Sequence, residues 1–167
     1  MALPIGYQQT ISQPYIVARM TESLIEGDKM NEVPINHCLE IGTGCGYQTY
    51  ILSLFSKKVT SVERIEPLQD KAKETLKNLG VRNVTFKIDD GNNLGRLKYD
   101  AILSAAAPLS VPSTLKERLA VGGRLILPVG DSQRQVLTLI HRIDNDSYEE
   151  KRLEDVLFVP LLKGIVS

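Results

Sequence analysis

The chain has 167 residues, the size of one domain with a full hydrophobic core. Hydrophobic residues make up 43% and charged residues 24%, and the 20 basic and 20 acidic side chains cancel. Zero net charge disfavours a general nucleic-acid binder, and no apolar run approaches the roughly 20 residues that span a bilayer. We therefore expect a single domain over residues 1–167, with no nucleic-acid or membrane partner.

Cys38 and Cys45 are seven positions apart, a spacing typical of neither a metal site nor a disulfide framework. The opening residues MALPIGYQQT show neither the charged start nor the long apolar run of a signal peptide. Reduced thiols in a cytoplasmic protein are the simpler interpretation, and we expect no metal.

Apolar periodicity predicts strands and helices in alternation through the first 130 residues. The predicted helices lie at about 14–26, 46–55, 67–79 and 112–119. The predicted strands lie at 37–41, 59–63, 84–88, 99–104, 124–129 and 136–143, with a last one within 156–161. Ser12 can cap the first helix, Pro14 suits its first turn, and Gly27 can stop it.

This alternation is typical of a doubly wound, mostly parallel α/β sheet with a Rossmann-like arrangement. The strand at 99–104 is mostly apolar, as expected of a strand buried on both faces. The closing strands are joined by a short turn at Asn145 and Asp146, which predicts an antiparallel edge near the C-terminus.

The most informative stretch is EIGTGCG, Glu40 to Gly46, at the end of the first strand of this sheet. Alternating glycines let the backbone approach a nucleoside-like ligand, and the next helix offers free N–H groups. A dinucleotide fingerprint would need a third glycine at position 47, which is tyrosine. The pattern is instead similar to the loop of S-adenosylmethionine-dependent methyltransferases. In that case Gly42, Gly44 and Gly46 would line the cofactor, and Glu40 would orient the loop or reach the methionine amine.

Two carboxylates end the following strands. Glu63 lies 21 residues after Gly42, where it can accept hydrogen bonds from both ribose hydroxyls; a pair with Arg64 or a helix-start charge is the alternative. Asp90 ends the third strand, where an acceptor can meet the adenine amino group, and Gly91 frees the backbone beside it. Asp89 is interpreted as a solvated turn residue.

Four further segments narrow the family: IGYQQTISQPYIVA at 5–18, YDAILSAAAP at 99–108, GGRLILPVG at 122–130 and FVPL at 158–161. Over about Leu3 to Gly164 the chain resembles the protein-L-isoaspartate O-methyltransferases, and TISQP is the specific part. The resemblance implies methyl transfer from S-adenosyl-L-methionine to the α-carboxylate of L-isoaspartyl residues in damaged proteins or peptides, which starts their repair. We expect such a protein to act as a monomer.

The resemblance also implies roles on the acceptor side. Thr10 and Ser12 match the family's Thr-Ile-Ser, whose serine hydroxyl is placed at the substrate carboxylate. Ala106, Ala107 and Pro108 match the turn that lines the acceptor site, for which tight packing against a helix is the alternative. The family's cofactor positions fall on Gly42, Gly44, Gly46, Glu63 and Asp90.

The chain departs from the family pattern at Gln8 and Asp89, where many members have glycine, and at Cys45, where serine is frequent. The family usually carries a further helical segment before the Leu-Pro-Ile-Gly stretch, and the sequence begins at that stretch. Because this segment helps to cover the cofactor, a cofactor-binding domain with weak or no catalysis is one alternative function.

A carboxylate acceptor, with a pKa of about 4, is already ionised at neutral pH. The site therefore needs positioning, desolvation and hydrogen-bond donors rather than a general base. His37 and His141 fall away from the carboxyl ends of the strands and are interpreted as structural. A carboxyl methyltransferase acting on aspartate of a modified peptide stays open. A nucleic-acid methyltransferase is disfavoured because the Asn/Asp-Pro-Pro-aromatic motif is absent after the fourth strand.

Overall fold

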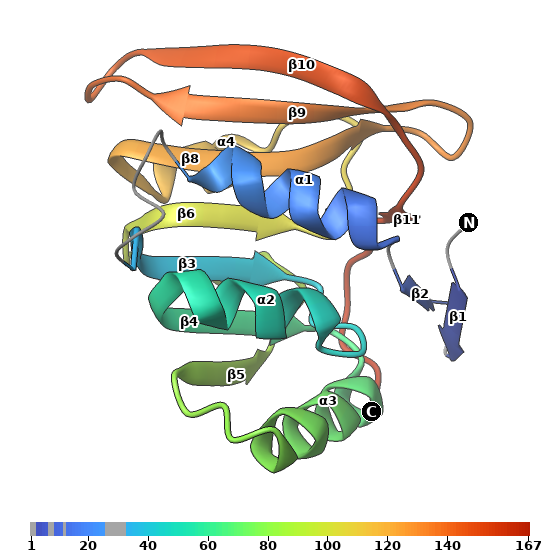
Figure 1. Ribbon diagram of the computed structural model, residues 1–167. Helices are drawn as coiled ribbons and strands as arrows, with labels where there is room; N and C mark the ends of the chain where they lie inside the picture. Colours follow the sequence, from blue (N-terminus) through green and yellow to red (C-terminus); the bar gives the residue numbers. More distant parts are fainter. Residues whose placement is uncertain (1–2, 7–8, 12, 26–32) are drawn as a thin grey trace.

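The computed structural model describes residues 3–6, 9–11, 13–25 and 33–167 (Figure 1). Its central sheet has seven strands in the order β10-β9-β8-β6-β3-β4-β5. They are β3 (Ile35–Ile41), β4 (Ser56–Glu63), β5 (Val84–Ile88), β6 (Tyr99–Ser104), β8 (Leu119–Gly130), β9 (Gln135–Arg142) and β10 (Tyr148–Val156). The helices are α1 (Pro14–Leu24), α2 (Tyr47–Phe55), α3 (Glu66–Asn78) and α4 (Ser113–Glu117).

Two short strand pairs lie outside this sheet. The N-terminal hairpin pairs β1 (Leu3–Gly6) with β2 (Gln9–Ile11) in antiparallel fashion. Near the other end of the chain, β11 (Val159–Pro160) runs parallel to β7 (Ala106–Ala107). Among the described residues, no helix is long and apolar enough to cross a membrane.

The predicted doubly wound sheet is confirmed. Strands β3, β4, β5, β6 and β8 run parallel, whereas β9 and β10 form the expected antiparallel edge. Helices α1 and α2 lie in front of the sheet and α4 lies behind it (Figure 1). The chain runs outward from β3 to β5 and then returns to β6 on the other side of β3. In open α/β sheets, ligands bind at the carboxyl ends of the strands beside such a switch point.

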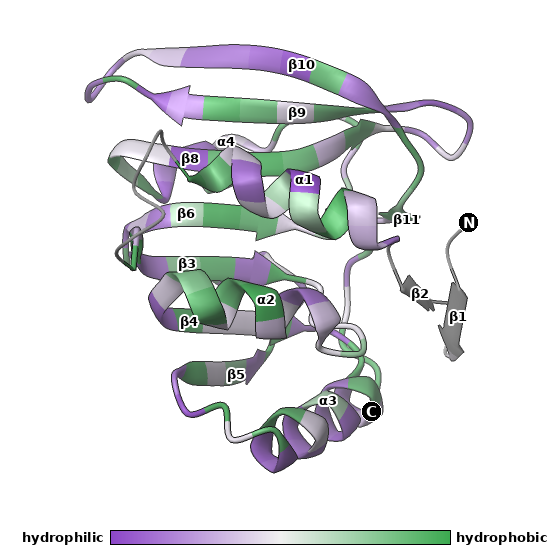
Figure 2. Ribbon diagram, in the orientation of Figure 1, coloured by the Kyte–Doolittle hydropathy of each residue, from purple (hydrophilic) through white to green (hydrophobic). Residues whose placement is uncertain are grey.

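Both faces of the central strands are buried, as predicted for 99–104. Leu103 and Ile126 pack toward α1 and α2, and Ile102 packs with Leu115 of α4 on the other face. Figure 2 shows hydrophobic residues concentrated in the central strands and hydrophilic ones along β10. The buried layers fix the strand ends, and therefore the loops that follow them.

The first helix begins at Pro14 as predicted, but its predicted cap and its end need correction. Its N-cap is Gln13, with φ −63° and ψ 148°, and not Ser12. The residue before a proline is held in an extended conformation, so the helix begins at Pro14 itself. It ends at Leu24, two residues before the predicted Glu26. Ser12 and Gly27 lie outside the described residues.

The C-terminal third differs most from the prediction. The prediction does not include the long strand β10. Its sequence YEEKRLEDV is charged and lacks apolar alternation, as is usual for an edge strand. The predicted last strand shrinks to β11. Helix α4 is shorter than predicted, because β8 already begins at Leu119. The Gly122-Gly123 pair lies inside β8, where a Cβ at Gly123 would lie 2.8 Å from the Ala120 carbonyl oxygen.

Candidate functional site

A pocket opens at the switch point, where β3, β4, β5 and β6 end. Its walls are the ends of these strands, the loops that follow them, and a segment from near the C-terminus. The lining residues are Ile41, Gly42, Gly44, Val62, Glu63, Arg64, Asp89, Asp90, Ala105, Ala106 and Val159–Leu162. The pocket therefore gathers predicted site residues from four separate strand ends.

The glycine loop is tied down to the neighbouring strand. The main-chain N–H of Gly42 donates to the Val62 carbonyl at 2.8 Å, and that of Gly44 donates to Glu63 Oε1 at 3.0 Å. Gly42 has φ +94°, and a Cβ there would lie 3.4 Å from Ala105 Cβ. Only glycine adopts this backbone easily. Because Gly42 and Gly44 carry no side chain, the pocket floor is bare main chain at these two positions.

Gly46 has a different place. It is the N-cap of α2 with φ +90°, it is buried, and a Cβ there would lie 3.3 Å from Ala72 Cβ of α3. It therefore permits the close approach of α2 and α3. Gly46 is not among the residues that line the switch-point pocket, and its contact with the cofactor stays a prediction.

Glu63 lines the pocket and is 7% exposed. Its Oε2 accepts the main-chain N–H groups of Arg64 and Ile65 at 2.9 and 3.1 Å, in addition to the Gly44 bond to Oε1. The contact with Arg64 is through its main-chain N–H and not through its guanidinium group. A carboxylate offers about four acceptor positions, so these three bonds leave one of them free. An open anionic acceptor beside bare glycines fits a ribose hydroxyl.

The acidic turn after β5 is organised by its own carboxylates. Asp89 Oδ1 accepts the N–H groups of Gly91 and Asn93, and the residue lines the pocket; its interpretation as only a solvated turn residue is wrong. Asp90 accepts from Asn92 at 3.1 Å and from Gly164 at 2.8 Å. The Gly164 N–H is the main cause that lowers the pKa of the Asp90 carboxyl.

Gly91, with φ +88°, lies at the edge of a separate hollow that Asn92 and Arg96 also line. Its predicted role in freeing the backbone beside Asp90 agrees with this conformation. Direct contact with a nucleoside in the pocket stays a prediction for both Asp90 and Gly91.

Glu40 lies behind the glycine loop and is fully buried. Its Oε1 accepts from Thr49 Oγ1 and from Ser61 Oγ, and Ser61 Oγ in turn contacts Thr43 Oγ1 of the loop at 2.7 Å. Burial raises the pKa of this carboxyl to about 7. The geometry favours orientation of the loop over contact with a methionine amine.

This burial makes stability depend on pH. Between the ordinary pKa of 4.5 and the folded value of about 7, the folded state holds a proton that the unfolded chain has lost. Stability from Glu40 is thus full below the lower value and falls as pH rises. In the wild type, the free energy of unfolding should fall by about 2 kcal/mol between roughly pH 5 and pH 7 because of Glu40. Glu40→Gln should not show this fall, because glutamine does not titrate. Urea unfolding at each pH measures it, with the exposed Glu74→Gln as control; parallel curves for wild type and Glu40→Gln would contradict it.

The predicted acceptor turn follows β6. Ala106 lines the pocket, whereas Ala107 and Pro108 line an adjoining groove, together with Gln135 and Leu157–Leu162. The Ser104 hydroxyl donates to the Ala106 carbonyl at 2.7 Å, and Leu161 N–H donates to the Ala107 carbonyl at 2.9 Å. The turn therefore lies between two adjoining hollows, which share Val159–Leu162 as lining residues.

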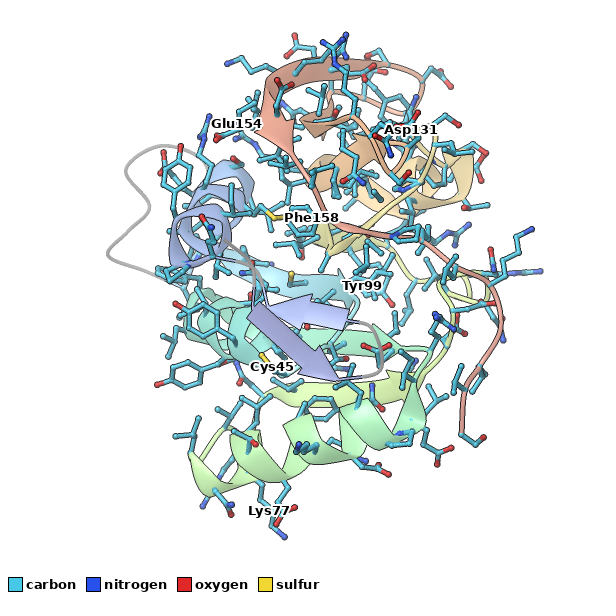
Figure 3. The ribbon with its side chains drawn as sticks, turned by 90° about the vertical axis from the view of Figure 1, so that its right-hand side faces the viewer. Cys45, Lys77, Tyr99, Asp131, Glu154 and Phe158 are labelled. Atoms are coloured by element: carbon cyan, nitrogen blue, oxygen red, sulfur yellow. The ribbon has the colours of Figure 1, made fainter. Side chains whose placement is uncertain are left out.

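Strand β2, which contains Thr10, lies in the hairpin beyond the carboxyl ends of the parallel strands (Figures 1 and 3). Ser12 lies outside the described residues. The hairpin thus lies at the same end of the strands as the pocket. The predicted roles of Thr10 and Ser12 require this position and stay predictions.

Sequence reasoning missed the C-terminal segment and Arg64 as pocket walls. The FVPL motif at 158–161 was the available signal for the C-terminal segment. His37 lies away from the pocket, as predicted. Its Nε2 contacts Thr60 Oγ1 at 2.8 Å, its ring meets Tyr99 edge-on, and burial lowers its pKa. His141 lies within β9.

Comparison with known proteins adds independent evidence. The profile of the protein-L-isoaspartate(D-aspartate) O-methyltransferase (PCMT) family matches residues 1–165. A protein-L-isoaspartate O-methyltransferase of Saccharophagus degradans is 52% identical over 98% of the chain and 73% of its own length. One from Alcanivorax borkumensis is 48% identical over 99% of the chain and 73% of its own length. The chain spans 53% of the Burkholderia cenocepacia relative, at 48% identity over 99% of the chain.

A solved structure agrees with these relatives. A Plasmodium falciparum protein described as a protein-L-isoaspartate O-methyltransferase, in complex with S-adenosyl-L-homocysteine, superposes with a TM-score of 0.79 and 25% identity. The match covers 98% of this chain and 80% of that one. A match of the family profile to nearly every residue, on the same fold, leads to one conclusion: the chain belongs to the protein-L-isoaspartate(D-aspartate) O-methyltransferase family.

Proposed function

We propose that this protein transfers a methyl group from S-adenosyl-L-methionine to the α-carboxylate of L-isoaspartyl residues in damaged proteins or peptides. The observation that carries the proposal is the convergence of Gly42, Gly44, Glu63 and Ala106 on one pocket at the switch point. Family membership supports the choice of cofactor and acceptor.

The residues present fit the cofactor. Gly42 and Gly44 leave a bare floor, and Glu63 offers one open acceptor position to the ribose. When bound, the sulfonium supplies an electrophilic methyl group and leaves as a neutral thioether. The chain's own part is to hold the nucleoside and to direct an acceptor oxygen toward that methyl group. Glu40 keeps the loop in shape through Ser61 and Thr43.

The acceptor chemistry needs no base from the protein. The carboxylate oxygen arrives ionised, a C–O bond forms as the S–C bond breaks, and two opposite charges vanish. A site that excludes water favours this loss of charge. We propose that Thr10 and Ser12 donate hydrogen bonds to the carboxylate, and that the small turn Ala106, Ala107 and Pro108 lets the peptide backbone approach.

We further propose that the protein acts as a monomer in the cytoplasm, where Cys38 and Cys45 stay free thiols. Its partners are then isoaspartyl-containing proteins or peptides.

A paired-peptide assay tests the proposal. The chain is incubated with methyl-labelled S-adenosylmethionine and two peptides that differ only in a normal or an iso aspartyl linkage. Label on the iso peptide alone is expected. Label on both peptides would point to a broader carboxyl methyltransferase. Label on neither, with S-adenosylhomocysteine still bound in calorimetry, would reduce the chain to a cofactor-binding domain.

A further inference from the structure

The segment from Leu157 to Val166, here called the C-terminal strap, crosses the carboxyl ends of the parallel strands. It descends from β10 at one edge of the sheet and ends beside α3 near the other (Figure 1). Its residues Val159–Leu162 line both the switch-point pocket and the adjoining groove. Any movement of this strap therefore changes both hollows.

The far end of the strap is held near the nucleoside side of the pocket. Gly164 N–H donates to Asp90 Oδ2 at 2.8 Å, and Val166 N–H donates to the Arg64 carbonyl at 2.7 Å. The Glu66 N–H donates back to the Val166 carbonyl at 2.8 Å. These bonds attach the strap to the loops after β4 and β5.

The middle of the strap pairs with β7 and bonds to Ala107, and its near end, at Phe158, is held by the side chain of Gln135 at the start of β9. Its Oε1 accepts Phe158 N–H at 2.7 Å, and its Nε2 donates to the Phe158 carbonyl at 3.0 Å. The same Nε2 donates to the Asp131 carbonyl at 3.0 Å. The Gln135 amide thus bonds to both main-chain groups of Phe158, as a neighbouring strand would. Because Gln135 is only 2% exposed, water does not replace these bonds easily.

Phe158 lies at a junction. Its side chain packs against the core cluster under α1, and Figure 3 shows it between α1 and the outer strands. Phe158 and Leu157 also line the groove beside Ala107 and Pro108. Gln135 thus fixes the wall of the hollow on the acceptor side, at the end of the strap opposite to Asp90.

We infer that Gln135 is a positioning residue for the acceptor: by holding Phe158, it sets how the peptide substrate meets the groove without setting cofactor affinity. This inference rests on the proposed function. The two ends of the strap are held by separate bonds, so loss of the Gln135 bonds frees the groove wall at Phe158, while the β7 pairing holds the middle and Asp90 and Arg64 keep the nucleoside side in place.

The test compares Gln135→Leu, which keeps the size but loses the three bonds, with the exposed neighbour Gln133→Ala. For Gln135→Leu, the KM for an isoaspartyl peptide should rise about tenfold or more. S-adenosylhomocysteine affinity should change less than about threefold, and Gln133→Ala should match wild type. Equal losses of peptide and cofactor binding, or an unchanged KM, would overturn the inference. The milder Gln135→Asn serves if the leucine variant does not fold.

Hydrogen exchange separates this inference from the proposed function. If wild type methylates neither peptide, the proposed function fails, and exchange in the wild-type and variant chains still reports on the strap. Protection lost at Phe158 but kept at Gly164 and Val166 supports separate holding of the two ends. Loss along the whole strap, or at none of these amides, overturns it.

Discussion

Glu63→Gln is expected to weaken S-adenosylhomocysteine binding about a hundredfold. The substitution keeps the side-chain shape but removes the charge and turns one acceptor oxygen into a donor. That donor must face either the N–H groups of Arg64 and Ile65 or the N–H group of Gly44. Hydrogen bonds to a charged group contribute about 1.5–3 kcal/mol each, so loss of the ribose bond and distortion of the loop combine. Isothermal titration calorimetry measures the change.

Glu66→Gln is the matched control, because Glu66 is an exposed carboxylate three positions away at the start of α3. It should bind as wild type does. If Glu63→Gln stayed within threefold of wild type, on the order of 0.6 kcal/mol, Glu63 would be only an anchor of the loop.

Ser12→Ala is expected to lower turnover of an isoaspartyl peptide by about ten- to a hundredfold. The proposed role of the hydroxyl is to donate one hydrogen bond to the acceptor carboxylate. Because Gln13 is the N-cap of α1, loss of the Ser12 hydroxyl should leave the helix start intact. Steady-state turnover with labelled cofactor measures the effect, and S-adenosylhomocysteine affinity should stay the same.

Ser147→Ala, in the exposed turn between β9 and β10, controls for loss of a serine far from the site. Full activity of Ser12→Ala would show that this hydroxyl takes no part in methyl transfer. Equal loss of stability and turnover would instead assign it a structural part.

The parallel half of the fold is predictable because glycine, proline and acidic turns separate its apolar strands. Both β5 and β6 have the predicted bounds, 84–88 and 99–104. Strand β10 is not predictable from hydrophobic periodicity, since an edge strand exposed to water keeps charged residues. Its place in the sheet depends on pairing with β9, which the sequence pattern does not show.

The site was predictable in its chemistry and less so in its geometry. Glu63 is the last residue of β4 and lines the pocket, whereas Glu40, the residue before the last in β3, lies buried behind it. Strand alternation alone does not say which side chain faces a ligand, because loop hydrogen bonds decide it. The strap and Gln135 join segments far apart in sequence, and such contacts appear only in the folded chain.

We propose that an already ionised carboxylate is positioned, and not deprotonated, at the glycine-floored pocket. A crystal structure with S-adenosylhomocysteine and an isoaspartyl peptide tests it most directly. We expect the ribose on Glu63, and the isoaspartyl carboxylate between the segment at Thr10 and Ser12 and the turn at Ala106. A peptide bound away from this pocket, or a carboxylate paired with a histidine base, would show that the acceptor is not positioned in this way.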